Sequence, residues 1–243
     1  MKILPVFCLL LIVQQESFKQ AQLKEARVKV AYEEAEDSVK KQFTDAHLSM
    51  DGFQMFIRAF KKEAVLEVWV KEKNTDKFAL LHTYDFCATS GVLGPKRKQG
   101  DLQIPEGVYQ INHFNPVSNF YLSLGINYPN ASDLILSDKK KPGNAIYIHG
   151  GCATIGCIPI TDDGIKELYV TAVEAKNNGQ QKIAVHIFPS RLNAGIVEQL
   201  VNEQKADAKT SAFWKNLELV YRDFQSTKKL RQVRVNSNGT YYF

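Results

Sequence analysis

The sequence of 243 residues has little of several features that would by themselves point to a class of protein. Its four cysteines are too few for a scaffold built from disulfides at this length. No apolar run reaches the roughly 18 residues that a membrane-spanning helix needs, so we expect no membrane span. The formal net charge is only +5, which is too weak to indicate nucleic-acid binding.

The composition is otherwise that of an ordinary globular protein. Apolar residues make up 44% of the chain and charged residues 23%, which excludes intrinsic disorder and collagen-like structure. We find no internal repeat and no low-complexity tract. The length suits one large domain or two small ones.

The N-terminus has the pattern of a secretory signal peptide. Lys2 is followed by an apolar run over 3–13 and then at once by polar residues. We therefore predict a leader over residues 1–19, although no small-x-small triplet marks its cleavage site; a buried first strand or helix is the alternative. Loss of the leader would remove Cys8 and leave three cysteines, which suit one disulfide and one free thiol in an oxidising compartment.

The rest of the chain predicts an α+β protein in three parts. Residues 20–50 form a helical lead-in, 51–190 a β-rich core, and 191–243 a helical C-terminal extension that ends in a hairpin at Asn238-Gly239. Alternating apolar residues predict strands over 53–60, 64–71, 78–86, 108–114, 120–126, 145–148 and 182–188, and helical patterns cover 20–42, 194–202 and 211–224.

One helix inside the core is especially well marked. Thr161 is a suitable N-cap, and Asp162 and Asp163 would lie favourably in the first helical turn. Gly179 ends the pattern. Between these ends, one apolar face has helical spacing; its members are Ile165, Leu168, Tyr169, Ala172 and Val173.

The segment HGGCATIGC, residues 149–157, carries the residues best suited to chemistry. A nucleophilic cysteine needs a base, and histidine is the usual one, so we predict Cys157 as nucleophile and His149 as base. Gly156 would let backbone N–H groups approach a reacting carbonyl. The alternatives are a structural thiol beside a core histidine, and a zinc site that uses Cys152 as well but lacks a fourth ligand. We expect neither metal nor cofactor.

These motifs resemble those of the L,D-transpeptidases with the YkuD catalytic domain, in particular their YafK-like branch. In that family His-Gly precedes Ser-x-Gly-Cys, as His149-Gly150 here precedes Thr154-Ile155-Gly156-Cys157. The resemblance covers about 53–189, with a further match in the tail. Its other motifs are Ser90-Gly91, Leu93–Lys96, Pro105–Tyr109, Asn115–Ser118, Leu122–Leu124, Tyr128–Asn130 and Phe213–Leu217.

Two positions depart from the family pattern. Thr154 replaces the usual Ser and keeps its hydroxyl group. Pro159 stands where many members carry Arg or Asn two residues after the nucleophile. Proline offers neither a side-chain donor nor an amide N–H, so any contact that the Arg makes in the family is lost here.

The resemblance implies a mainly β L,D-transpeptidase-like catalytic domain, with curved sheets or a β-sandwich and a helix after the nucleophile. It implies an exported enzyme of the periplasm or cell envelope that acts on peptidoglycan stem peptides through a thioester on Cys157. A second stem or a wall-attached protein would supply the acceptor amine. A hydrolase of the same fold and a non-catalytic wall-binding module are the alternatives.

Further residues are candidates for an oxyanion hole, a disulfide and contacts with substrate. The backbone N–H groups of Gly156 and Cys157 are candidates for an oxyanion hole, with Thr154 and Gly150 supporting the motif. Cys87 and Cys152 are expected to form a disulfide in an exported protein, although Cys152 could stay free or resolve an oxidised Cys157. Four residues could contact substrate, although buried aromatic residues and a solvated basic loop are the plainer readings: Lys96, Tyr109, Tyr128 and Asn130.

Overall fold

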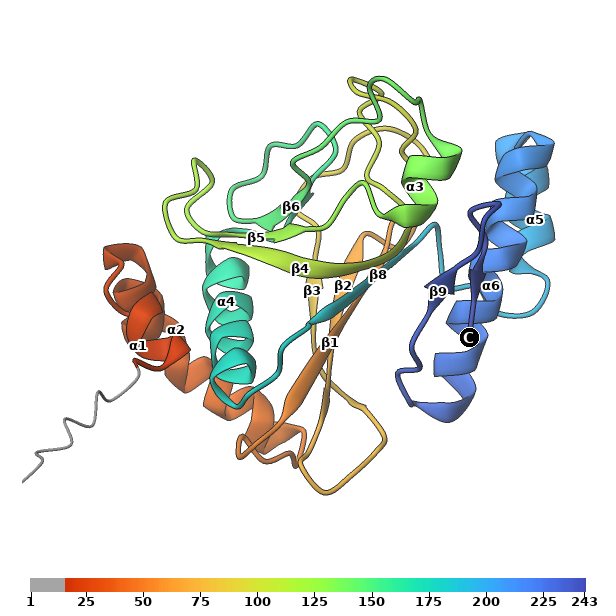
Figure 1. The fold of residues 1–243 in the computed structure, drawn as a ribbon. Helices are drawn as coiled ribbons and strands as arrows, with labels where there is room; N and C mark the ends of the chain where they lie inside the picture. Colours follow the sequence, from red (N-terminus) through yellow and green to blue (C-terminus); the bar gives the residue numbers. More distant parts are fainter. Residues whose placement is uncertain (1–15) are drawn as a thin grey trace, which may run out of the picture.

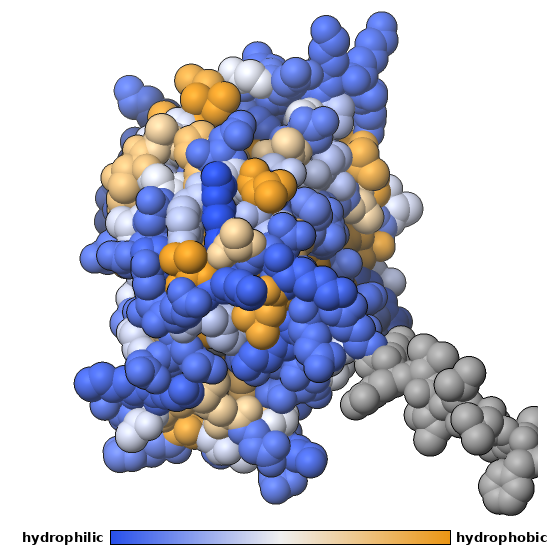
Figure 2. Space-filling view, turned by 90° about the vertical axis from the view of Figure 1, so that its left-hand side faces the viewer, coloured by the Kyte–Doolittle hydropathy of each residue, from blue (hydrophilic) through white to orange (hydrophobic). Residues whose placement is uncertain are grey.

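The computed structural model describes residues 16–243, so most of the predicted leader lies outside the described residues. The predicted α+β fold is confirmed: one curled sheet separates two groups of helices (Figure 1). Within residues 16–243, no helix is long and apolar enough to cross a membrane. The face that carries α1 and α2 is largely hydrophilic, with hydrophobic groups in separate small patches (Figure 2).

The sheet has eight strands in the order β3-β2-β1-β8-β4-β5-β6-β7. The pairs β1–β8 and β6–β7 are parallel, and the other neighbours are antiparallel. The strands are β1 Gln54–Phe60, β2 Val65–Lys71, β3 Ala79–Asp85, β4 Gly107–Asn115, β5 Ser123–Ile126, β6 Tyr147–His149, β7 Ile158–Pro159 and β8 Ala184–Phe188, with a separate hairpin of β9 Arg234–Val235 and β10 Tyr241–Tyr242.

Strand β4 joins the two halves of the sheet. Its first residues, 107–110, pair with β8, whereas residues from Ile111 to Asn115 pair with β5. The register shifts between Ile111 and His113, and such an irregularity bends a strand. As a result β5, β6 and β7 curl away from the rest of the sheet, and Figure 1 shows this part at the top of the molecule.

Helices cover both faces of the central strands, which is why β1 and β8 are buried on both sides. Ile57 and its register partner Val185 pack in the same core as α2 and α4, whereas Phe60 and its partner Phe188 pack against α6. The helices are α1 Phe18–Gln22, α2 Ala26–Asp45, α3 Ala131–Leu136, α4 Asp162–Asn177, α5 Ile196–Gln204 and α6 Ala208–Thr227.

The local signals of α4 are confirmed. The side chain of Thr161 accepts a hydrogen bond from the Gly164 N–H at 3.2 Å, and Asp162 and Asp163 lie in the first turn. The helix ends just before Gly179, whose φ of +96° suits a glycine. Its apolar face packs against α2 and the sheet.

Some predicted boundaries are wrong for identifiable reasons. The strand expected over 120–126 begins only at Ser123, because Tyr121 has a φ of +68°, which no strand accommodates. The strand expected over 145–148 runs instead from Tyr147 to His149, and Ala145 has a φ of +55°. Helix α3 was not predicted because six residues are too few to show helical periodicity.

The N-terminal residues of the described chain, from Ser17 onward, pack against the core. Ser17 forms a capping box with Gln20 at the start of α1. The Phe18 ring lies 5.0 Å from the ring of Phe114, and Lys19 forms an ion pair of 2.7 Å with Glu174 of α4. Residues 17–19, which the sequence assigned to the leader, therefore contact the core.

A buried ion pair ties the C-terminal extension to the sheet. The Lys61 ammonium group, at the end of β1, lies 3.0 Å from Glu106 and donates to the carbonyl oxygens of Gly94 and Ile104. Its three hydrogens thus have three acceptors. The other oxygen of Glu106 accepts a hydrogen bond of 2.7 Å from the Trp214 indole in α6.

Replacing Glu106 by Gln would leave the Lys61 ammonium group buried without a counter-charge. We expect Glu106→Gln to lower the free energy of unfolding by about 3–5 kcal/mol. The neighbouring pair Lys62–Glu203 is a matched control, because both of its side chains are about 40% exposed, and Glu203→Gln should have little effect. Urea denaturation measures both; an equal loss in the two variants would contradict the expectation.

Candidate active site

Two short parallel strands place His149 and the predicted nucleophile. Ile148 of β6 pairs with Ile158 of β7, and His149 pairs with Pro159. Ile148 and Ile158 point into the core, so the residues next to them point to the opposite face. His149 and Cys157, which directly precedes β7, therefore share one face of neighbouring strands.

Cys157 is half-buried and carries the one free thiol among residues 16–243. Its Sγ accepts a hydrogen bond from the Tyr147 N–H at 3.4 Å and lies 3.8 Å from the carbonyl oxygen of Ala145. Burial raises the pKa of the Cys157 thiol, and the Tyr147 N–H and the charge of Lys96 oppose that shift. At neutral pH the resting side chain is therefore a thiol.

His149 is buried and neutral. Burial lowers the pKa of the imidazole, while the hydrogen bond with Gly150 opposes the shift. Its Nδ1 contacts the carbonyl oxygen of Gly150. A carbonyl oxygen can only accept, so Nδ1 carries the proton and Nε2 carries the lone pair. Nε2 has no hydrogen-bond partner within the described chain, which leaves it free to act as a base.

An aromatic ring covers the imidazole. The ring of Phe120 stacks on His149 with centroids 4.4 Å apart and an interplanar angle of 29°. Phe120 is itself 42% exposed, so it separates the buried His149 from solvent. Phe120 was not predicted from the sequence, because its contact with His149 joins the β4–β5 loop to β6. Tyr147 was not predicted either, because it contacts Cys157 through its backbone N–H, which no side-chain pattern indicates.

The hydroxyl group of Thr154 fixes the turn before Cys157. It accepts hydrogen bonds from the N–H groups of Cys157 at 2.8 Å and Gly156 at 3.2 Å, and it donates to the Cys157 carbonyl oxygen at 2.8 Å. The two N–H groups predicted to form an oxyanion hole thus point at Thr154 in this structure. The Thr that departs from the family pattern satisfies this turn through its hydroxyl group.

Two motif glycines lie close against the backbone of neighbouring loops. A Cβ atom on Gly150 would lie 2.8 Å from the carbonyl oxygen of Phe120 and would also clash with the Asp162 carboxylate. Gly156 has a φ of +137°, and a Cβ atom there would lie 3.0 Å from the Gln103 carbonyl oxygen. Both glycines thus allow the neighbouring loops to approach the site closely.

A disulfide joins Cys87 and Cys152, whose Cα atoms lie 5.3 Å apart. It links the chain after β3 to the loop between His149 and Cys157. This is the pairing expected from the sequence, and it uses the Cys152 sulfur that a zinc site would need. Among the residues from 16 onward, no group of three or more His, Cys, Asp or Glu side chains is placed to hold a metal ion.

Pro159 fits its position in the sheet. Strand β7 is the last in the strand order, so the missing N–H of Pro159 leaves no ladder position empty on the outer side. Its carbonyl oxygen accepts a hydrogen bond of 3.0 Å from the Cys87 N–H. The residue therefore helps to hold the loop that follows β3 beside the site.

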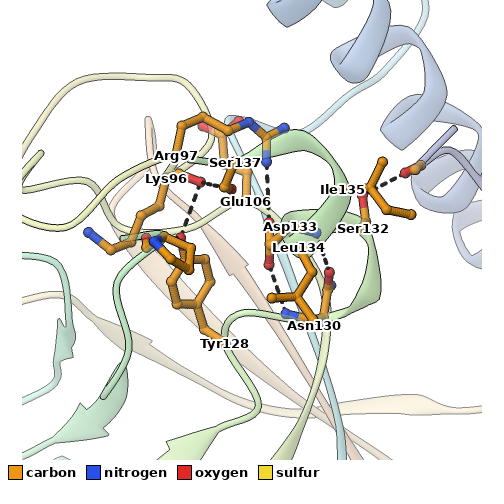
Figure 3. Close-up of polar contacts among 12 residues, drawn as sticks. Lys96, Arg97, Glu106, Tyr128, Asn130, Ser132, Asp133, Leu134, Ile135 and Ser137 are labelled. Atoms are coloured by element: carbon orange, nitrogen blue, oxygen red, sulfur yellow. Dashed lines mark hydrogen bonds and ion pairs between the residues drawn. The ribbon is translucent and has the colours of Figure 1, made fainter. Parts of the chain in front are cut away.

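The structure gives the predicted substrate-contacting residues internal partners, and Figure 3 shows Tyr128 and Asn130 among them. The Tyr109 hydroxyl donates to Asp133 at 2.9 Å, and the Tyr128 hydroxyl donates to the Pro142 carbonyl oxygen at 2.8 Å. Asn130 caps α3 through the Asp133 N–H. These buried side chains support the loops beside the site, and their contact with substrate stays a prediction.

Lys96 is buried rather than part of a solvated basic loop. Its ammonium group forms an ion pair of 2.6 Å with Asp101. Asp101 also accepts hydrogen bonds from the N–H groups of Arg97, Lys98 and Gln103. The positive charge of Lys96 nevertheless lies close enough to Cys157 to oppose the rise in the pKa of its thiol.

Comparison with known proteins gives a consistent family assignment. The model of the L,D-transpeptidase catalytic domain (YkuD) matches residues 55–185. The chain is 34% identical over 192 residues to YafK of Escherichia coli K12, whose name marks its L,D-transpeptidase activity as provisional; the match covers 78% of this chain and 74% of that protein. A protein of Escherichia coli O157:H7 with the same name matches equally.

Solved structures show more distant similarity. The helical cell shape determining protein Pgp2 of Campylobacter jejuni has a TM-score of 0.45 and 16% identity, with 82% of this chain and 80% of that chain covered. Bd1075 of Bdellovibrio bacteriovorus has a TM-score of 0.39 and 23% identity, with 56% and 48% covered.

The cover provided by Phe120 predicts the protonation behaviour of His149. Phe120→Ala would admit water to the imidazole and stabilise its charged form, so we expect the pKa of His149 to rise toward its ordinary value. Phe120→Tyr keeps an aromatic ring over the imidazole, so the pKa of His149 should stay low. Phe114→Leu is the control, because it changes an aromatic residue that packs against Phe18 and not against His149, and it should leave this pKa unchanged. NMR titration of the imidazole measures the pKa; an unchanged value in Phe120→Ala would contradict this role.

Proposed function

Because the chain belongs to the L,D-transpeptidase family with the YkuD catalytic domain, we propose that it is an exported cysteine acyltransferase acting on peptidoglycan stem peptides. The observation that carries the proposal is the placement of a free thiol and a neutral imidazole on the same face of β6 and β7. His149 has its proton on Nδ1 and its lone pair on Nε2, which is the tautomer that a general base needs.

In the proposed reaction, His149 Nε2 takes the proton of the Cys157 thiol as the sulfur attacks a carbonyl carbon of a tetrapeptide stem. The bond to the terminal D-residue breaks, the proton passes from His149 to the leaving amine, and a thioester remains on Cys157. An amine of a second stem or of a wall-attached protein then attacks the thioester. That step forms a new amide and restores the thiol.

The contacts around Cys157 and His149 stabilise the charged groups that form during this reaction. The Tyr147 N–H and the Lys96 charge both favour a negative sulfur, so they stabilise the thiolate as it forms. The Gly150 carbonyl oxygen holds Nδ1–H and favours the imidazolium that follows proton transfer. No acidic side chain is needed to orient His149, because the backbone does so.

Removal of the thiol tests the nucleophile. We expect Cys157→Ala to abolish turnover of purified muropeptides. The double variant Cys87→Ala/Cys152→Ala lacks the other two cysteines of the described chain but keeps the nucleophile, so it should still turn over muropeptides. Mass analysis of the products measures both variants. Activity of Cys157→Ala at the parent level would contradict the assignment.

The same products distinguish the possible outcomes of the thioester. Loss of the terminal D-residue together with a new cross-link identifies transfer to an amine. Loss without a cross-link identifies transfer to water, which is the reaction of a hydrolase. A parent protein that binds the wall and leaves muropeptides intact would be a non-catalytic module.

The proposed export has consequences for the N-terminus and the cysteines of the mature protein. Since Ser17, Phe18 and Lys19 pack on the core, we expect cleavage of the leader to retain Ser17. The mature protein should contain the Cys87–Cys152 disulfide and a free Cys157. Intact mass and non-reducing peptide mapping of protein recovered from the envelope check both; an unprocessed chain or a Cys152–Cys157 bond would contradict this proposal.

A further inference from the structure

The C-terminal extension and the catalytic domain together form a pocket of about 470 Å³ away from Cys157. It lies between α3, the first turns of α6 and the turn of the β9–β10 hairpin. Residues of the loop before β4 complete its wall. The side chains that matter for its chemistry are Arg97, Leu136, Lys209 and Phe213.

Arg97 is held in place at the pocket wall (Figure 3). One guanidinium nitrogen lies 3.3 Å from the Asp133 carboxylate, and the guanidinium lies 4.8 Å from the centre of the Phe213 ring. Asp133 is buried and is fixed in turn by the Tyr109 hydroxyl and the Asn130 N–H. The Arg97 side chain is 27% exposed, and its other N–H groups donate to no acceptor in residues 16–243.

The remaining lining combines a second cation with apolar side chains. Lys209 is exposed on the first turn of α6 and forms no ion pair within the described chain. Leu136 and Phe213 supply apolar surface. The one carboxylate of the lining, Asp207, accepts a hydrogen bond of 2.7 Å from the Thr210 N–H as the cap of α6. Free donors on two cations beside apolar surface suit a carboxylate attached to an aliphatic chain.

One loop connects this pocket with the candidate nucleophile. Arg97 follows Lys96, whose charge affects the pKa of Cys157. Farther along the same loop, the Gln103 carbonyl oxygen packs directly on Gly156. A polymer that carries many stem peptides could therefore place one stem at Cys157 and another in the pocket.

We propose that this pocket binds the terminal carboxylate of a peptidoglycan stem peptide, as a second contact with a substrate that carries many stems. The proposal rests on the proposed function for its choice of ligand. Arg97 would bind the carboxylate with its unpaired N–H groups, Lys209 would add a second positive charge, and Leu136 and Phe213 would contact the aliphatic part of the stem. Linked contacts of this kind raise the affinity for a polymer well above that for a single stem.

Binding of the Cys157→Ala protein to purified sacculi tests the pocket without any turnover. In this background, Lys209→Gln and Arg97→Gln should each raise the apparent Kd about tenfold, as expected for the loss of a hydrogen bond to a charged group. Lys215→Gln, on the exposed side of α6, and Lys98→Gln, beside Arg97, remove the same charge outside the pocket and should bind as the parent does. Cosedimentation at physiological ionic strength measures all five proteins.

Sacculi whose carboxylates have been converted to amides test the class of ligand. On these sacculi the difference between the parent and Lys209→Gln should disappear. A difference that persists would exclude a carboxylate as the ligand, and equal losses in the two control variants would show a general effect of charge; either result overturns the proposal. Arg97→Gln could also disturb α3, but Lys209 is exposed, so parent-like binding by a folded Lys209→Gln variant overturns it as well.

These outcomes are distinct from failure of the proposed function. If the parent protein turns over muropeptides while both pocket variants bind sacculi normally, the catalytic proposal stands and the pocket proposal falls. If the parent protein leaves muropeptides unchanged, the catalytic proposal falls. Binding by Cys157→Ala then still reports on the pocket alone.

Discussion

The buried Glu106 carboxylate is the interaction that joins the sheet, the loop before β4 and the C-terminal extension. It binds Lys61 at the end of β1, the Gly94 N–H in the loop before β4, and the Trp214 indole of α6. Each partner is itself buried, so none of these contacts can be replaced by water. The loop held at Gly94 continues to Lys96 and Gln103, which act on Cys157 and Gly156. The C-terminal extension therefore belongs to the same packed unit as the candidate active site.

The site combines two groups whose pKa values burial shifts in opposite directions. Desolvation raises the pKa of the Cys157 thiol and lowers the pKa of the His149 imidazole, and both effects favour the uncharged forms. In the proposed reaction, the proton therefore moves from Cys157 to His149 during attack, and no permanent thiolate–imidazolium pair is needed. Such a resting state limits adventitious reaction of the thiol, because only the thiolate is strongly nucleophilic.

Local signals predicted much of the fold, and the features that they missed arise from contacts distant in sequence. The strand pair before Lys71 and the cap of α4 were predictable because alternation and capping are properties of neighbouring residues. The curl of the sheet at β4 was not, because it depends on which strands pair. The family motifs located His149 and Cys157, but the stacking of Phe120 and the role of Thr154 required the folded loops. Burial of Lys96 was missed because its partner Asp101 lies in a turn that brings several N–H groups onto one carboxylate.

The loop between His149 and Cys157 shows why the positions of these residues are tightly constrained. The disulfide holds Cys152 to Cys87, the Asp162 carboxylate accepts a hydrogen bond of 2.8 Å from the Gly151 N–H, and the Thr154 hydroxyl closes the turn at Cys157. Three different kinds of interaction therefore hold one short loop, at Gly151 and Cys152 near its start and at Cys157 at its end. Each of them removes conformations that the loop would otherwise have to give up when substrate binds. Since one of the three is a disulfide, the full constraint exists only where Cys87 and Cys152 are oxidised.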